Sequence, residues 1–292
     1  MKKEIVSGAR LAFIFVLCVF MVDPIVSGYI HSLDSKVVSS IITPGTAIAL
    51  YMMSKKHLPA GLFKVSERMS AGTFFTAFGL FALLQFCTAV SELFSPNDVA
   101  IAGSDTPGNI FYMGFIVPIC EEMFFRGTIA PRYEKYGRVF SIVATSLLFG
   151  MYHINLIQLV SGFFAGLVFC YIAGRYCIVW SMLLHMLNNG VLVLLLKPLF
   201  KASGNVFLAR YGAITVCAVF VVVGAVFAIS NHPVKKVRSY LSEGAGAEKG
   251  AYKALILNVW TILLLIIDIV VTIGLVYFGP EVVDSMTNIG KD

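Results

Sequence analysis

Long apolar stretches separated by short polar connectors make up most of the chain. A helix needs about 20 mostly apolar residues to cross a lipid bilayer. Nine windows approach or reach this length, and we expect each to be a membrane-spanning helix: 11–30, 37–53, 73–93, 109–129, 139–155, 157–174, 178–196, 211–230 and 254–279. The fifth and sixth windows almost merge, so eight spans is the alternative. The pattern predicts an all-α, polytopic transmembrane helix bundle.

Composition supports a membrane protein. The chain of 292 residues is 58% hydrophobic and only 13% charged, whereas a soluble domain carries about 25% charged residues. This number of charged residues is too small to cover a water-facing surface of this size. Most of the surface must therefore face lipid. The six cysteines are scattered through apolar runs without C-x-x-C spacing, which predicts neither a disulfide framework nor a zinc finger.

The positions of the basic residues indicate which side of the membrane each connector faces, because cytoplasmic connectors carry an excess of Lys and Arg. With a cytoplasmic N-terminus, the inner segments hold all of the 22 Lys and Arg residues except Lys36, Lys197, Lys201, Arg210 and Lys291. We therefore expect a multi-pass protein of the cell membrane with its N-terminus in the cytoplasm. Without a repeat or a second soluble region, residues 1–292 are interpreted as one membrane domain, in which 109–196 is the motif-bearing core.

Ionisable side chains inside a spanning helix are costly, so each is a candidate functional residue. Most of them concentrate in the fourth, fifth and seventh windows. Glu122 and Arg126 are four residues apart, so they share a helix face and can pair. Glu121 lies about 100° around the helix from Glu122, so the two adjacent carboxylates should have separate environments, with Glu121 directed toward a cavity.

Two further pairs have the same spacing and supply the remaining chemistry. Phe149 and His153 lie one helical turn apart, as do His185 and Asn189. Carboxylate and imidazole are the usual bases that activate water, and the anionic oxygen of a tetrahedral intermediate needs preorganised donors. Glu121 with His153 could take the first role, and His185 with Asn189 the second. A covalent nucleophile is not expected, because no Ser, Thr or Cys lies in a comparable polar cluster.

These residues resemble a known family. Its three ordered motifs match Glu121-Glu122-x-x-x-Arg126, Phe149-x-x-x-His153 and His185-x-x-x-Asn189. The family is the CAAX protease and bacteriocin-processing family of intramembrane glutamic proteases, which includes the type II CAAX prenyl endopeptidases. The resemblance covers roughly residues 110–196.

The resemblance implies a CAAX-type intramembrane glutamic endopeptidase with an all-α bundle and a cavity open toward the cytosol and the lipid. Glu121 and His153 would activate the water, and His185 and Asn189 would form the oxyanion site. Glu122 and Arg126 would have a supporting or substrate-binding role. We expect a peptide or protein substrate, the bilayer as the other partner, no nucleic acid and no cofactor.

Three alternatives remain open at this stage. Zinc held by Glu121, His153 and His185 would make a metal-dependent protease, since two histidines and a carboxylate suit a catalytic zinc site. A non-catalytic regulator, scaffold or immunity protein could bind a partner protein through the same cavity. A transporter could use these groups as a proton relay, although the sequence has no inverted repeat.

The depth of His153 in the membrane is a difficulty for this topology. If the fifth helix enters the membrane at Val139, His153 lies about 21 Å along it, deeper than the other polar groups. We therefore expect residues 133–138 to extend this helix into the cytoplasm. Asn155 is predicted to orient His153 from the following turn, and Asp268 in the last span to pair with another helix.

Overall fold

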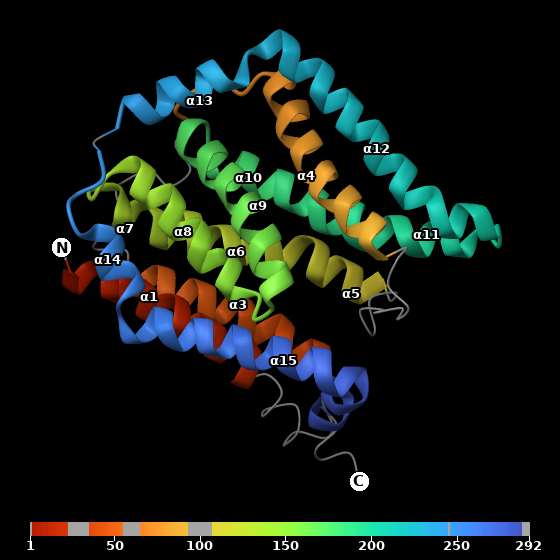
Figure 1. The fold of residues 1–292 in the computed structure, drawn as a ribbon, viewed down its shortest axis with the longest axis horizontal. Coiled ribbons are helices and arrows are strands. Elements are labelled where there is room, and N and C mark those ends of the chain that lie inside the picture. Colours follow the sequence, from red (N-terminus) through yellow and green to blue (C-terminus); the bar gives the residue numbers. More distant parts are fainter. Residues whose placement is uncertain (1, 23–34, 55–64, 93–106, 245, 288–292) are drawn as a thin grey trace. The chain divides into compact units, whose positions relative to one another are not determined.

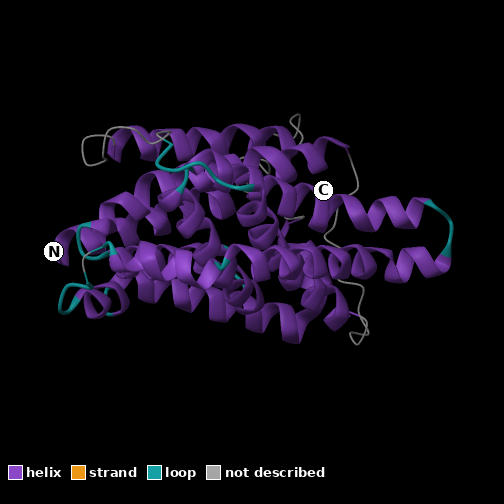
Figure 2. Cartoon of the chain, turned by 90° about the horizontal axis from the view of Figure 1, so that it is seen from above, coloured by secondary structure: helices purple, strands orange, loops and turns teal. Residues whose placement is uncertain are grey.

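The computed structural model describes residues 2–22, 35–54, 65–92, 107–244 and 246–287, and none of these residues forms a β-strand (Figures 1 and 2). The predicted all-α fold class is confirmed for this part of the chain. The elements, with η for a π-helical turn, are α1 (Lys2–Leu17), η1 (Cys18–Val22), α3 (Ser35–Ser54), α4 (Ala71–Glu92), α5 (Pro107–Phe111), η3 (Tyr112–Ile116), α6 (Val117–Phe124), η4 (Phe125–Ile129), α7 (Ala130–Glu134), α8 (Arg138–Tyr152), α9 (Leu156–Arg175), α10 (Ile178–Met186), η5 (Leu187–Leu195), α11 (Leu196–Ala202), α12 (Val206–Asn231), α13 (Pro233–Ser242), α14 (Ala251–Ile256) and α15 (Val259–Thr287).

Four helices of the described residues are long and apolar enough to cross a membrane, judged by length and composition: Ala71–Val90, Gln158–Arg175, Ile178–Ala202 and Val206–Asn231. Shorter apolar helices cover Ile41–Ser54, Arg138–Tyr152 and Val259–Gly274. Each of these helices overlaps one predicted window, which is typical of a membrane protein. Window 109–129 is helical but carries three charged residues, and window 11–30 extends beyond the described residues. The number of spans and the side of the N-terminus remain predictions.

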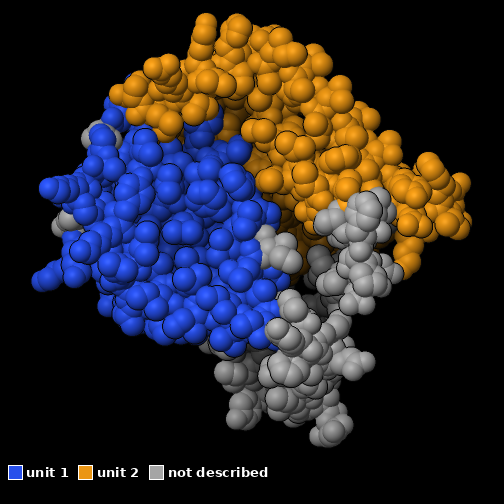
Figure 3. All heavy atoms as spheres, in the orientation of Figure 1, with its two compact units in different colours: residues 1–62, 120–171, 243–292 blue, residues 63–119, 172–242 orange. Residues whose placement is uncertain are grey.

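The chain divides into two compact units (Figure 3). The first comprises residues 1–62, 120–171 and 243–292, and the second comprises residues 63–119 and 172–242. The prediction that residues 1–292 form one membrane domain remains a prediction, and each unit is described separately below.

In the first unit, α1 packs against α7, α8, α14 and α15. Aromatic side chains fill the space between these helices. The buried ring of Phe15 lies 4.3 Å from the ring of Phe124 and stacks on Tyr152 at 5.2 Å, measured between centroids. Phe125 contacts Tyr152 in an edge-on arrangement. The aromatic core therefore joins α1 to the helices that carry the first two motifs.

Polar contacts outside the predicted spans connect α1 to the chain around the end of α7. The Glu4 carboxylate forms an ion pair with Lys135 and accepts a hydrogen bond from the Tyr136 hydroxyl. These donors, Lys135 first, lower the pKa of Glu4 to about 2. The Tyr133 hydroxyl donates to the Ile5 carbonyl oxygen at 2.9 Å. Glu4 is therefore held as a carboxylate down to strongly acidic pH.

The expected helical extension over residues 133–138 is wrong. Helix α7 ends at Glu134, and α8 begins only at Arg138. Between them Gly137 adopts a φ of +117°, a conformation that L side chains rarely adopt. A Cβ at Gly137 would also lie 2.6 Å from the Gly246 carbonyl oxygen. The close approach of another backbone segment thus requires a glycine turn at a position where an amphipathic pattern suggested a continuous helix.

In the second unit, α4 and α12 lie side by side (Figure 1). They approach most closely at Gly79 and Gly224, where a Cβ on either residue would lie 2.6 Å from the other Cα atom. The Phe75 and Phe227 rings stack at a centroid distance of 5.2 Å. Small residues that allow backbones to approach closely are typical of helix pairs in membranes.

Candidate active site

The first motif lies on a continuous run of helical turns from Pro107 to Glu134. Glu121 and Glu122 belong to α6, and Arg126 belongs to the π-turn η4 that follows it. The three residues are 4%, 0% and 4% exposed. Burying three ionisable side chains is expensive unless each charge is compensated, and π-turns inside α-helices occur frequently at functional sites.

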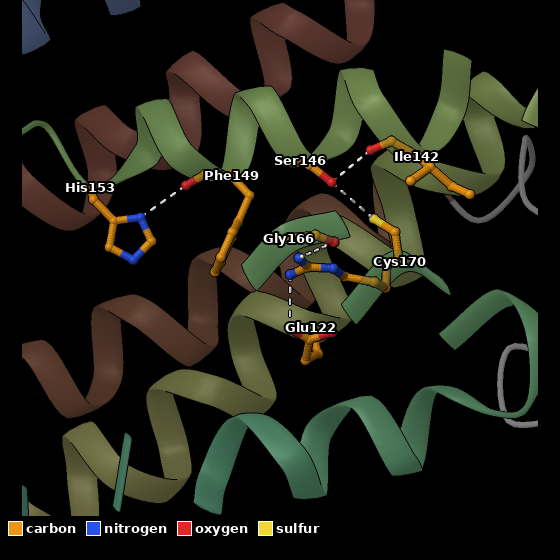
Figure 4. A network of polar contacts seen from close by, with 8 residues as sticks. Glu122, Ile142, Ser146, Phe149, His153, Gly166 and Cys170 are labelled. Carbon is orange, nitrogen blue, oxygen red and sulfur yellow. Dashed lines mark hydrogen bonds and ion pairs between the residues drawn. The ribbon is translucent and has the colours of Figure 1, made fainter. Parts of the chain in front are cut away.

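Arg126 connects the first motif to the second (Figure 4). Its Nη1 donates to the Glu122 Oε1 at 2.8 Å, and its Nη2 donates to the Gly166 carbonyl oxygen at 3.4 Å. The guanidinium also lies 4.3 Å from the ring centre of Phe149 and 5.1 Å from that of Phe169. The predicted Glu122–Arg126 pair is confirmed, and it is anchored to α8 and α9 as well as to its own helix.

Glu121 has a different partner. Its carboxylate accepts a hydrogen bond from the hydroxyl of Tyr152, the last residue of α8. Tyr152 is buried, with its ring against Phe15. The prediction of separate environments for the two adjacent carboxylates is therefore supported, since Arg126 binds Glu122 and Tyr152 binds Glu121. Sequence reasoning missed Tyr152, because a tyrosine inside an apolar run gives no signal that its hydroxyl has a specific task.

His153 follows Tyr152 and caps the C-terminus of α8. Its Nδ1 lies 2.9 Å from the Phe149 carbonyl oxygen, and its ring meets the Phe149 ring edge-on at 5.0 Å (Figure 4). A carbonyl oxygen only accepts hydrogen bonds. Nδ1 therefore carries the proton, and in the neutral imidazole the lone pair is on Nε2. Phe149 thus acts twice, since its carbonyl sets the tautomer of His153 and its ring covers Arg126.

The third motif belongs to the second unit. His185 is buried in the last turn of α10, and Asn189 lies in the π-turn η5 that continues it. Three side-chain amides form a chain that ends at Asn189, in which Gln85 Nε2 donates to Asn188 Oδ1 at 3.1 Å and Asn188 Nδ2 donates to Asn189 Oδ1 at 2.9 Å. Sequence reasoning missed Gln85, because it lies 103 residues before Asn188 in the chain and on another helix.

A close backbone contact supports the helix of the third motif. Gly190, which follows Asn189, packs against Gly114 of η3, and a Cβ at Gly114 would lie 2.8 Å from the Gly190 Cα atom. Gly114 lies on the helical run that continues into α6. The backbone next to Asn189 is therefore held by η3, which belongs to the same unit.

The predicted site residues thus fall into two groups. Glu121, Glu122, Arg126 and His153 lie in the first unit, and His185 and Asn189 lie in the second. The meeting of the two groups around one cavity remains a prediction. Within neither unit do three His, Cys, Asp or Glu side chains of the described residues come close enough to hold a metal ion. The zinc alternative needs ligands from both groups, and chelation experiments can test it.

Comparison with known proteins supports the resemblance that the motifs indicate. Residues 104–191 match the family model described as type II CAAX prenyl endopeptidase Rce1-like. The match includes all three motifs and covers less than half of the chain. No curated protein and no solved structure matches the chain.

Proposed function

We propose that this chain, whose residues 104–191 match the Rce1-like type II CAAX prenyl endopeptidases, is an intramembrane endopeptidase that hydrolyses a peptide bond near the membrane surface. The observation that carries the proposal is that two adjacent buried glutamates have different partners. Arg126 compensates Glu122, while Glu121 is directed to the end of α8, where His153 follows Tyr152. This arrangement supports a joint role of the Glu121 carboxylate and the His153 imidazole in activating water.

In the proposed reaction, Glu121 and His153 activate a water molecule. The Glu121 carboxylate or Nε2 of His153 accepts a proton as the water oxygen attacks the carbonyl carbon of the substrate. The carbon–nitrogen bond then breaks, and the same proton is delivered to the leaving nitrogen. The hydrogen bond from His153 to the Phe149 carbonyl oxygen supports this role, because it leaves the Nε2 lone pair as the basic site.

His185 and Asn189 are proposed to stabilise the negative oxygen of the tetrahedral intermediate. Both side chains can donate hydrogen bonds, and an oxyanion is stabilised most by donors that are positioned before it forms. The amide chain from Gln85 through Asn188 to Asn189 supports this role, because it restricts the orientation of the Asn189 carboxamide. Glu122 and Arg126 hold α6 against α8 and α9, which supports a structural role for this pair.

The test is peptide cleavage by purified protein in lipid nanodiscs, using a library of C-terminal peptides with and without a farnesyl group. Glu121→Ala and His153→Ala are each expected to lower the cleavage rate by about 10²–10⁴-fold, the usual contribution of a general base. Glu134→Ala and His232→Ala are matched controls, since both residues are exposed and lie outside the motifs. They should cleave at the wild-type rate.

Equal turnover by the wild type, Glu121→Ala and His153→Ala would remove the proteolytic assignment. In that case, an unchanged cellular phenotype of stably folded Glu121→Ala would favour a regulator that binds a partner protein. Loss of wild-type activity on chelation, restored by zinc, would instead establish the metal-dependent mechanism with Glu121, His153 and His185 as the ligands.

A further inference from the structure

The turn that follows His153 is short and sterically unfavourable. Helix α8 ends at Tyr152 and α9 begins at Leu156, so three residues connect the two helices. Ile154 has a φ of +53°, a left-handed conformation that is rare for a β-branched residue. Such a conformation persists only where the surrounding structure imposes it. Something outside the turn must therefore hold it in place.

Helix α15 supplies that contact. The Thr272 hydroxyl oxygen accepts a hydrogen bond from the Leu156 backbone N–H at 2.9 Å, while the same hydroxyl donates to the Asp268 carbonyl oxygen at 2.7 Å. The first N–H groups of an α-helix have no partner within the helix. Asn155 satisfies another of them, because its Oδ1 accepts from the Gln158 N–H at 3.3 Å. Thr272 thus caps α9 from a helix more than 100 residues later in the chain.

The position of α9 in turn determines where the His153 ring can lie. A Cβ at Gly162 of α9 would lie 3.3 Å from His153 Nδ1 and 3.2 Å from the Gly150 Cα atom. A Cβ at Gly150 would lie 2.5 Å from the Leu159 carbonyl oxygen. The imidazole therefore packs directly against the α9 backbone. Any displacement of the first turns of α9 changes the space available to His153.

We propose that Thr272 is a positioning residue, which fixes the N-terminus of α9 and thereby the His153 imidazole. The proposal rests on the proposed function, in which His153 helps to activate water. Asp268 lies one helical turn before Thr272 on α15, and its side chain is fully buried beside the Asn155 backbone. Helix α15, which lies outside the residues that match the family model, thus helps to position His153.

The first experiment measures backbone hydrogen exchange and needs no substrate. In the wild-type protein the Leu156 amide should exchange slowly, although the first N–H of a helix usually exchanges fast. Thr272→Val keeps the shape of the side chain and removes the hydroxyl, so Leu156 should lose protection. Thr272→Ser keeps the hydroxyl and should restore it. Fast exchange of Leu156 in the wild type would overturn the proposal without recourse to a variant.

The second experiment compares kcat and KM for whichever peptide the wild type cleaves. Thr272→Val should lower kcat about tenfold or more with KM within about twofold, because a misplaced catalytic group slows the chemical step. Thr272→Ser should return to the wild-type kcat. Thr215→Val is the matched control, since the Thr215 hydroxyl on α12 donates to the Tyr211 carbonyl oxygen four residues before it, as the Thr272 hydroxyl does to that of Asp268. It should leave kcat unchanged.

The two experiments separate the two hypotheses. If the wild type cleaves no peptide but the Leu156 amide loses protection only in Thr272→Val, the proposed proteolytic function is refuted, while the capping of α9 by Thr272 is supported. If the wild type cleaves peptides and Thr272→Val matches it in both exchange and kcat, the positioning role is refuted while the proteolytic function remains.

Discussion

Replacement of Glu122 by Gln tests how the buried charges of the first motif are compensated. The ion pair with Arg126 has an N–O distance of 2.8 Å, and its side chains are 1% and 0% exposed. Removal of one partner of a buried pair leaves an uncompensated charge and costs about 3–5 kcal/mol. The Gly166 carbonyl oxygen and the Phe149 ring still stabilise the guanidinium. We therefore expect the lower end of this range, about 3 kcal/mol, or roughly a hundredfold in the folding equilibrium.

The chain contains a matched control for this substitution. Glu134 and Arg138 form an ion pair with the same spacing of four residues, at 3.5 Å and with Glu134 53% exposed. Exposed pairs of this kind contribute about 0.3–0.5 kcal/mol. Glu134→Gln should therefore change the free energy of unfolding by less than a quarter of the amount expected for Glu122→Gln. The comparison separates the effect of burial on the contribution of an ion pair to stability from the effect of its spacing in the sequence.

A double substitution sharpens the test. Replacing both charges by apolar side chains of similar size, Glu122→Leu with Arg126→Met, removes the uncompensated charge and should recover most of the lost stability. The assay is equilibrium unfolding in mixed detergent micelles, followed by circular dichroism. The reasoning is refuted if Glu122→Gln is no less stable than Glu134→Gln. It is also refuted if the double variant loses as much stability as the sum of the losses in Glu122→Leu and Arg126→Met, each measured alone.

Further predictions concern three other contacts. Tyr152→Phe keeps the packed ring but removes the donor to the Glu121 carboxylate, so kcat for peptide cleavage should fall at least about tenfold. Gly79→Ala should separate α4 from α12, because the added Cβ would lie 2.6 Å from the Gly224 Cα atom, and it should lower the melting temperature measurably. Gly45→Ala is the control and should leave the melting temperature unchanged, because a Cβ at Gly45 meets nothing within 4 Å. The pKa of Glu4 is lowered to about 2 from 4.5, so its contribution to stability is complete above about pH 4.5 and is lost as pH falls toward 2; unfolding of Glu4→Gln should lack this acid dependence.

Contacts within one helix could be predicted from the sequence, because helical geometry alone determines which residues share a face. The Glu122–Arg126 pair and the meeting of Phe149 with His153 are of this kind, and both are present. The apolar windows gave most of the helices for a similar reason, since the length of an apolar run is a local property. The break at Gly137 was missed because a distant backbone segment, at Gly246, requires it.

Contacts between helices could not be derived in this way. Nothing in the local pattern shows that Tyr152 reaches Glu121, or that Thr272 caps α9, because each depends on how distant segments pack. Asn155 illustrates the difference, since its proximity to His153 was evident but its side chain caps α9 at Gln158. The placement of His185 and Asn189 relative to Glu121 belongs to the same class and remains a prediction.

The π-turns around the motifs have a consequence for comparing this chain with its relatives. Each widened turn accommodates one more residue than a regular α-helix, and such turns occur at Tyr112–Ile116, Phe125–Ile129 and Leu187–Leu195. A homologue with a regular helix at the same place is expected to be one residue shorter there. Insertions and deletions should therefore appear inside the motif-bearing helices as well as in the loops, and an alignment that forbids gaps in helices would shift Arg126 or Asn189 out of register.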